Sequence, residues 1–195
     1  MHTPGTTEQH QAWRRMGSRL GRSVKRFFGN RDASTAIEFT ALAIPFAMLV
    51  FAILESCISF AAQEVLTNAT DTIARQLRTG QLRPTDITET SLKKMICDRL
   101  DIVVAKGCPD LIVDLREFPT FAAAAAVKIK LTSDKDIDTT GFDVKPGKAL
   151  TRNMLRVFYK WPVITDFMRK AMSNLKDNKT LHFATTTWQN EPFDD

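Results

Sequence analysis

Apolar residues are spread unevenly along this chain, and their spacing predicts its main elements. An almost unbroken apolar segment runs from Phe39 to Ala62, and its first 16 residues, up to Leu54, carry no charge. As an α-helix the whole segment would be about 36 Å long, which is typical of a helix that crosses a bilayer. Apolar residues then recur about every four positions as far as Leu77. We therefore expect one long helix over residues 34–79, ended by Gly80.

The rest of the chain shows first a helical and then an alternating pattern. Residues 86–100 have the apolar spacing of a second helix. Apolar and polar residues then alternate, partly or strictly, in four segments that we predict to be strands: 111–118, 127–131, 154–161 and 181–188. The pattern predicts an α+β fold in which a long N-terminal membrane-spanning helix is followed by a helix and an antiparallel β-sheet. The corresponding domains are 1–33, 34–80 and 81–195.

The positive charge of the chain is confined to its first residues. The net charge is +5, and residues 1–33 account for all of it, since the remaining basic and acidic residues balance. A basic flank beside an apolar span predicts a cytoplasmic N-terminus, so the domain of residues 81–195 should be periplasmic. Residues 12–28 have the pattern of a basic amphipathic helix, which fits a segment lying on anionic lipid or a recognition leader. Nucleic acid is not expected as a partner.

Cysteine and histidine positions bear on the chemistry of the chain. Cys57 lies in the apolar run and is predicted to be a small hydrophobic residue. Cys97 and Cys108 follow the span and would lie in an oxidising compartment, where a disulfide between them would close a short loop. The chain has three histidines, none near these cysteines in the sequence, and none of the catalytic or nucleotide-binding motifs that we sought. We predict no metal, no cofactor and no enzymatic activity.

The junction between the basic segment and the apolar segment resembles a known processing site. Small residues at Ala33 and Ser34 are followed by Glu38, Phe39 and the apolar helix. This arrangement is similar to the class III motif of type IV pilin-like proteins. Residues 36–39, Pro45 and the Glu55 that closes the span resemble more specifically the TadE family of pseudopilins of the tight-adherence (Tad/Flp) pilus. Further similar patches lie in the C-terminal domain: Cys97, Cys108, the strand ending at Phe118, residues 156–162 and residues 190–193.

This resemblance implies a structural role in pilus assembly. The chain would be a minor pilin or pseudopilin that a prepilin peptidase cuts between Ala33, where the family usually has Gly, and Ser34. The processing site would comprise Ala33, Ser34, Glu38 and Phe39, and Glu38 and Glu55 would act in assembly and register. The protein would cross the inner membrane once, in contact with lipid, and would act there, in the pilus or at its tip. Its implied partners are other pilins and pseudopilins (TadF-like proteins and the major Flp pilin), the prepilin peptidase and the inner-membrane assembly platform.

Elementary physical chemistry gives Glu38 a plausible part in assembly. Cleavage before Ser34 would create a charged amine, and positions 34 and 38 lie on one face of a helix. An acid in the bilayer is costly unless it is paired, so Glu38 could pair with its own new amine or with that of a neighbour. Glu38 could instead lie at the level of the headgroups and have no role in assembly.

Two other classes of protein remain as alternatives. The first is a bitopic envelope protein whose uncleaved signal anchor presents a periplasmic binding domain, and it differs from a pseudopilin in keeping Met1. The second is a membrane-tethered enzyme or DNA-binding regulator. The second lacks a catalytic constellation and has no excess of positive charge after residue 33.

Overall fold

The computed structural model describes the backbone of residues 31–194 and the side chains of residues 35–194. Residues 1–30, with the predicted amphipathic helix over 12–28, lie outside the described residues. The chain divides into two compact units, one ending at Phe51 and the other beginning at Ala52. The division falls inside one helix, and the two units are described separately below.

Helix α2 (Arg31–Arg78) confirms the predicted long helix. Pro45 lies inside it, and the helix continues on both sides. Gly80 follows with a φ of +72°, a left-handed conformation that glycine adopts without steric cost and that commonly ends helices. A side chain at this position would also collide with the ring of Phe193, since an added Cβ would lie 2.7 Å from it. The stop predicted at Gly80 therefore has both a backbone cause and a packing cause.

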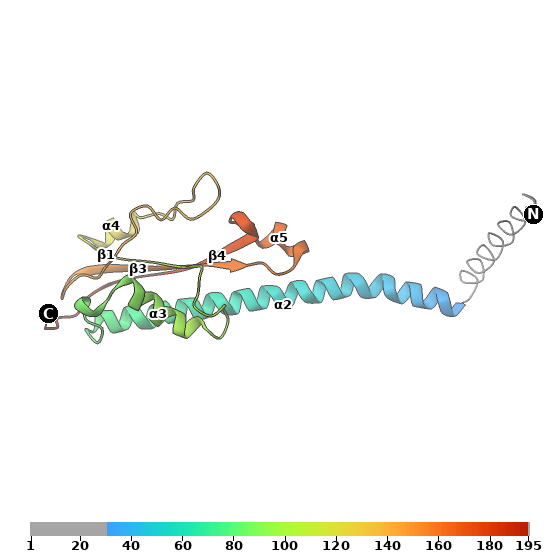
Figure 1. Cartoon of the computed structure of the whole chain (residues 1–195), viewed down its shortest axis with the longest axis horizontal. Coiled ribbons are helices and arrows are strands. Elements are labelled where there is room, and N and C mark those ends of the chain that lie inside the picture. Colours follow the sequence, from blue (N-terminus) through green and yellow to red (C-terminus); the bar gives the residue numbers. More distant parts are fainter. Residues whose placement is uncertain (1–30, 195) are drawn as a thin grey trace, which may run out of the picture. The chain divides into compact units, whose positions relative to one another are not determined.

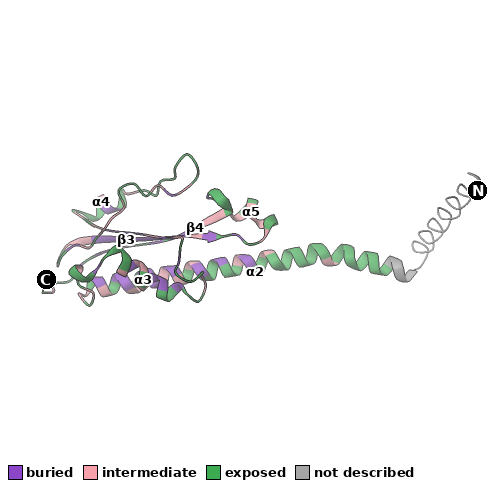
Figure 2. Cartoon of the chain, in the orientation of Figure 1, coloured by how far each residue is buried: buried purple, intermediate pink, exposed green. Residues whose placement is uncertain are grey.

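The first unit consists, in its described part, of the N-terminal portion of α2. Almost every side chain from Thr35 to Phe51 is exposed, including the large apolar ones (Figure 2). This helix is long and apolar enough to cross a membrane, and none of its most apolar window is buried within the protein. Its exposed apolar surface fits lipid as its surroundings.

In the second unit, the remainder of α2 packs against a small domain. Buried residues recur along it at intervals of three to four, which places Ala62, Leu66, Ile73 and Leu77 on one face in the core. Beyond Gly80, a short 3₁₀ turn, η1 (Pro84–Asp86), leads into helix α3 (Glu89–Leu100). A capping box between Thr88 and Ser91 starts α3. The predicted second helix is therefore confirmed, beginning three residues later than expected.

Four strands form one sheet in the order β2-β1-β3-β4. Strands β1 (Leu111–Phe118), β3 (Arg152–Pro162) and β4 (Lys179–Gln189) are antiparallel neighbours. The short strand β2 (Val144–Lys145) pairs with β1 in parallel, so the sheet is mixed and not purely antiparallel as predicted. The α+β class is confirmed, as are three of the four predicted strands.

Different elements cover the two faces of the sheet. On one face, residues such as Val113, Val157 and Ala184 join α2 and α3 in the hydrophobic core. Figure 1 shows these two helices on one side of the sheet, with α4 (Phe121–Ala125) and the loop that follows it on the other. A last helix, α5 (Asp166–Met172), and a 3₁₀ turn, η2 (Lys176–Asn178), connect β3 to β4. Because β3 and β4 are antiparallel, this helix does not form a βαβ crossover.

The strand predicted over residues 127–131 is wrong. Within the described part of the chain this segment is irregular, apart from an isolated bridge between Leu131 and Ile137. Its alternating lysines suggested a strand with one wet face, but Ile129 and Leu131 are exposed as well. One edge of β1 is already paired with β3, and β2 occupies part of the other edge. In the described structure, residues 127–131 pair with none of the four strands, and the alternation here belongs to an exposed loop.

Candidate functional site

The predicted processing residues lie at the beginning of α2. Ala33 and Ser34 are in its first turns, and their side chains lie outside the described part of the structure. Glu38 is exposed, as is Phe39, with 72% of its surface accessible. Positions 34 and 38 are four residues apart in continuous helix, as the proposed pairing of a new amine with Glu38 requires.

Hydroxyl groups in the apolar part of α2 are satisfied by the helix itself. Thr40 Oγ1 donates to the carbonyl oxygen of Ala36 at 2.8 Å, and Ser56 Oγ donates to that of Ala52 at 2.9 Å. Such bonds to the carbonyl four residues earlier let a hydroxyl face an apolar environment without an unpaired donor. These polar residues are therefore compatible with a membrane-spanning helix.

Glu55 is the second acid predicted to act in assembly, and it is buried, with 6% of its surface accessible. Its Oε1 accepts hydrogen bonds from the backbone N–H groups of Ile164 at 2.5 Å and Thr165 at 3.2 Å. Its Oε2 accepts from the Thr165 N–H at 3.3 Å and from the Thr165 hydroxyl. A buried carboxylate is tolerated only with such partners. Glu55 thus fixes the segment that enters α5 to the long helix, and we call these contacts the Glu55 clamp.

One turn further along α2, a polar cluster joins the helix to β4. Ser59 Oγ and His182 Nε2 are 3.0 Å apart, and the imidazole ring stacks on the indole of Trp161 with 5.5 Å between centroids. Burial lowers the pKa of His182 below its ordinary value of 6.5, because desolvation disfavours the charged imidazolium. His182 thus acts as a neutral packing and hydrogen-bonding group between the helix and the sheet.

Further polar contacts continue along α2 in register with β4. Gln63 exchanges hydrogen bonds with the backbone of Phe183, Asp71 accepts from the Thr186 hydroxyl, and Arg78 pairs with Glu191 at 3.0 Å. Successively later residues of α2 therefore meet successively later residues of the C-terminal segment. The sequence analysis missed these contacts, because none of the residues has a local pattern that marks a partner more than a hundred positions away.

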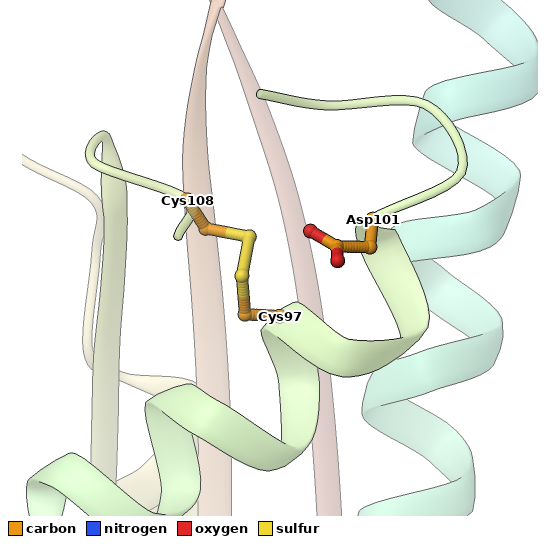
Figure 3. Close-up of side chains that lie close together, drawn as sticks. All are labelled: Cys97, Asp101 and Cys108. Carbon is orange, nitrogen blue, oxygen red and sulfur yellow. A yellow bond between two sulfur atoms is a disulfide. The ribbon is translucent and has the colours of Figure 1, made fainter. Parts of the chain in front are cut away.

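The structure joins Cys97 and Cys108 by the predicted disulfide (Figure 3). The bond ties the end of α3 to the turn before β1. The carboxylate of Asp101 lies close to both sulfur atoms, so the three side chains could resemble a metal site. Metals bind cysteine as the thiolate, and here both sulfur atoms are engaged with each other. The cluster is therefore a covalent link between two elements. The remaining cysteine, Cys57, is exposed on α2.

A buried ion pair on the second face of the sheet was also not predicted. Asp114 of β1 and Arg156 of β3 are direct cross-strand neighbours. The Arg156 guanidinium donates to Asp114 Oδ2 from Nε at 2.9 Å and from Nη2 at 2.6 Å, and both side chains are almost completely buried. Asp114 Oδ1 also accepts the backbone N–H of Asp143, just before β2. The pair therefore helps to hold the loop that covers this face.

Glu38 and Glu55 occupy different stretches of α2, and Glu55 contacts the segment that enters α5. The assembly role of either acid remains a prediction.

Comparison with known proteins gives one match, which falls on the long helix. Residues 33–75 match the model of the family described as TadE-like protein. The match begins at the predicted processing position, covers less than a quarter of the chain, and confirms the resemblance to this family. No curated protein and no solved structure matches the chain. The similarity to TadE-like proteins is therefore established over the long helix.

Proposed function

We propose that this protein is a minor pilin or pseudopilin of a Tad/Flp type IV pilus and that a prepilin peptidase cuts it between Ala33 and Ser34. Its role is structural: it primes the pilus, lies at its tip or acts at the membrane during assembly. The observation that carries the proposal is helix α2, which combines an exposed apolar stretch with a stretch that forms part of a domain core. A simple anchor needs only the first of these.

The helix also supports a specific use of Glu38. Cleavage would place a charged amine on Ser34, one helical turn from the carboxylate. In lipid the two charges attract strongly, and a neighbouring subunit can supply either partner. Subunits whose helices pack with an axial offset would satisfy both charges, and Glu38 would then set their register. The partners in this step are other pilins and pseudopilins, including the major pilin and TadF-like proteins, on the inner-membrane assembly platform.

The proposed topology is a single crossing of the inner membrane. The basic leader stays cytoplasmic and the domain after the span is periplasmic. The Cys97–Cys108 disulfide favours this orientation, because disulfides persist in the periplasm and are rare in the cytoplasm. The protein would contact membrane lipid along α2 and would require no cofactor.

An uncleaved bitopic envelope protein is the second candidate, since an exposed apolar helix followed by a domain would serve it equally well. The two functions differ at the mature N-terminus. Sequencing this terminus in protein extracted from the native membrane should give Ser34 for a pseudopilin. An intact Met1 would support the second candidate.

Substitution of Ala33 tests whether the cut depends on the predicted motif. A prepilin peptidase needs a small residue before the cut, so Ala33→Leu should leave the full-length chain in the membrane. Ala33→Gly restores the usual family residue and should preserve or increase cleavage. Immunoblotting of membranes separates the two forms by the mass of the leader. Normal processing of Ala33→Leu would overturn the assigned cleavage site.

A further inference from the structure

The Glu55 clamp places helix α5 beside the end of the apolar span. Leu54, the last residue of the uncharged run, directly precedes Glu55, whose carboxylate is bonded to Ile164 and Thr165. Around this point several large apolar side chains are exposed. Phe60 on α2 is 73% accessible and Ile164 is 68% accessible, and further apolar exposure comes from Ile53, Leu54, Ile58 and Phe167.

The length of the span indicates how deep this end of the domain lies. A bilayer core of about 30 Å needs about 20 helical residues, and a span that starts at Phe39 would therefore end near Ile58. Glu55 would then lie within the edge of the hydrocarbon layer, where a bare carboxylate is costly. The Glu55 clamp offsets this cost, because the carboxylate oxygens accept hydrogen bonds from the domain. The groups that satisfy Glu55 must lie at the same depth.

We propose that α5 and the residue before its cap, Ile164, rest in the outer interfacial layer of the membrane that α2 crosses. The occupant of this surface is bilayer lipid. Apolar side chains of Ile164 and Phe167 would enter the boundary between headgroups and acyl chains. The inference rests on the membrane topology proposed above, and it adds a second, non-spanning contact between the domain and the bilayer.

The charges of α5 fit an interfacial position. Asp166 is paired with Arg169 at 2.5 Å, which leaves the exposed Lys170 as the unbalanced charge of the helix. Lys170 follows Phe167 by three residues, so the two side chains share one side of α5. A lysine beside an apolar residue can bury its methylene stem at the interface and extend its ammonium group towards phosphate. The bilayer surface is continuous with the lipid around α2, which favours lipid as the occupant over a separate partner.

A hollow beside α5 extends this apolar surface. This hollow has a volume of about 330 Å³ and lies between α2 and the α5–β4 segment, with Phe60, Met172 and His182 in its wall. Another cavity of the domain, of about 370 Å³, differs in having several charged residues in its lining. The hollow beside α5 therefore lies at the same end of the domain as the Glu55 clamp. This hollow gives room for part of an acyl chain next to the helix.

Depth-dependent quenching of a fluorophore on the full-length chain tests the inference. The protein, with Cys57→Ser, is placed at one chain per nanodisc of phosphatidylethanolamine and phosphatidylglycerol. An environment-sensitive fluorophore is attached at Phe167→Cys, and in a second variant at Ile164→Cys, in case one label perturbs α5. Nitroxide-labelled lipids then report how close each fluorophore lies to the bilayer. We expect both positions to be quenched most by nitroxides near the headgroups.

Two control positions make the outcome decisive. Leu150→Cys labels an exposed apolar residue at the Arg78 end of the domain. Its carbonyl oxygen accepts from the Gln189 side chain, and the neighbouring Thr151 carbonyl accepts from the Asn190 N–H. It should be quenched several-fold less than Phe167→Cys. Phe46→Cys labels the span and should be quenched by nitroxides deep in the bilayer. If Phe46→Cys is quenched and both α5 labels behave like Leu150→Cys, the inference is wrong while the membrane topology stands.

Other outcomes also decide the question. An unquenched Phe46→Cys would overturn the proposed topology and the inference together. A parallel sample with two chains per nanodisc tests for contact between copies. If the α5 labels change their emission only in that sample, α5 contacts a second copy of the chain and not lipid, and the inference is wrong.

Discussion

Glu55 illustrates how one residue can serve both the membrane segment and the folded domain. An acid at the end of an apolar helix needs hydrogen-bond donors wherever water is excluded. The donors come from Ile164 and Thr165, which lie 109 and 110 positions later in the chain. These contacts fix the start of α5. From Glu55 onwards, one side of α2 is buried against the domain. A carboxylate that appeared from the sequence to mark only the end of the span is thus also a tertiary anchor.

Removal of this carboxylate should destabilise the domain. Glu55→Ala leaves the two backbone N–H groups and the Thr165 hydroxyl without their acceptor, at a cost of about 1–3 kcal/mol. The free energy of unfolding can be measured by urea titration in detergent micelles, followed by tryptophan fluorescence. Glu64→Ala is the matched control, because Glu64 is exposed on the same helix and its loss should change stability by less than about 0.5 kcal/mol. Equal effects of the two substitutions would contradict the role of the clamp.

His182 should make the stability of the domain depend on pH. Its pKa in the folded protein is lowered by burial below the ordinary value of 6.5, so the folded state favours the neutral ring. This contribution is complete above pH 6.5 and is lost as the pH falls through the folded-state pKa. Unfolding free energies measured between about pH 7 and about pH 5 should therefore decrease, and less so in His182→Asn. A nuclear magnetic resonance titration that gives His182 a pKa above 6.5 would refute this explanation.

The Asp114–Arg156 pair marks a limit of sequence-based prediction at the scale of residues. Alternation correctly predicted strands that include both residues, but charged side chains are normally assigned to the wet face of a sheet. Here the second face is covered by the loop before β2, which donates a backbone hydrogen bond to Asp114. The position of that loop in the tertiary structure excludes water from this face of the sheet. No local sequence pattern predicts where the loop lies.

At the scale of elements, strong periodicity was the reliable guide. The long helix, α3 and strands β1, β3 and β4 each have a pattern that extends over at least eight residues, and all were predicted. The segment over 127–131 has a clear alternation, yet it joins none of the four strands of the described sheet. Strand β2 has only two residues, so its parallel pairing with β1 could not be predicted from periodicity. Pairing partners, and with them the mixed character of the sheet, depend on contacts between distant segments.

The disulfide should stabilise the link between α3 and β1. In the loop-entropy model, a bond that closes a loop with a sequence separation of 11 contributes about 2–3 kcal/mol. The double variant Cys97→Ser/Cys108→Ser should therefore lower the free energy of unfolding by this amount, and reduction of the wild-type protein should have a similar effect. Cys57→Ser is the control, since this cysteine is free and exposed. A double variant as stable as the control would show that the bond contributes nothing to folding.

In the whole molecule, one continuous helix carries an exposed apolar stretch and then enters the core of a disulfide-linked α+β domain. The family match covers this helix and begins at the proposed cut. Processing would convert the start of α2 into a charged terminus next to Glu38, and assembly would pair this terminus with a carboxylate. We therefore propose that Glu38 acts when subunits come together and not in insertion or folding.

Counting surface pili in a strain that carries only Glu38→Gln tests this claim most directly. The substitution keeps the size of the side chain and its hydrogen-bonding capacity but removes the charge. The variant should be inserted, cut and stable in the membrane, and the strain should form few or no pili. Glu64→Gln, an exposed acid later on the same helix, serves as the control and should leave pilus number unchanged. Normal pilus number in a strain whose Glu38→Gln protein is correctly processed would contradict the account and favour a plain membrane anchor.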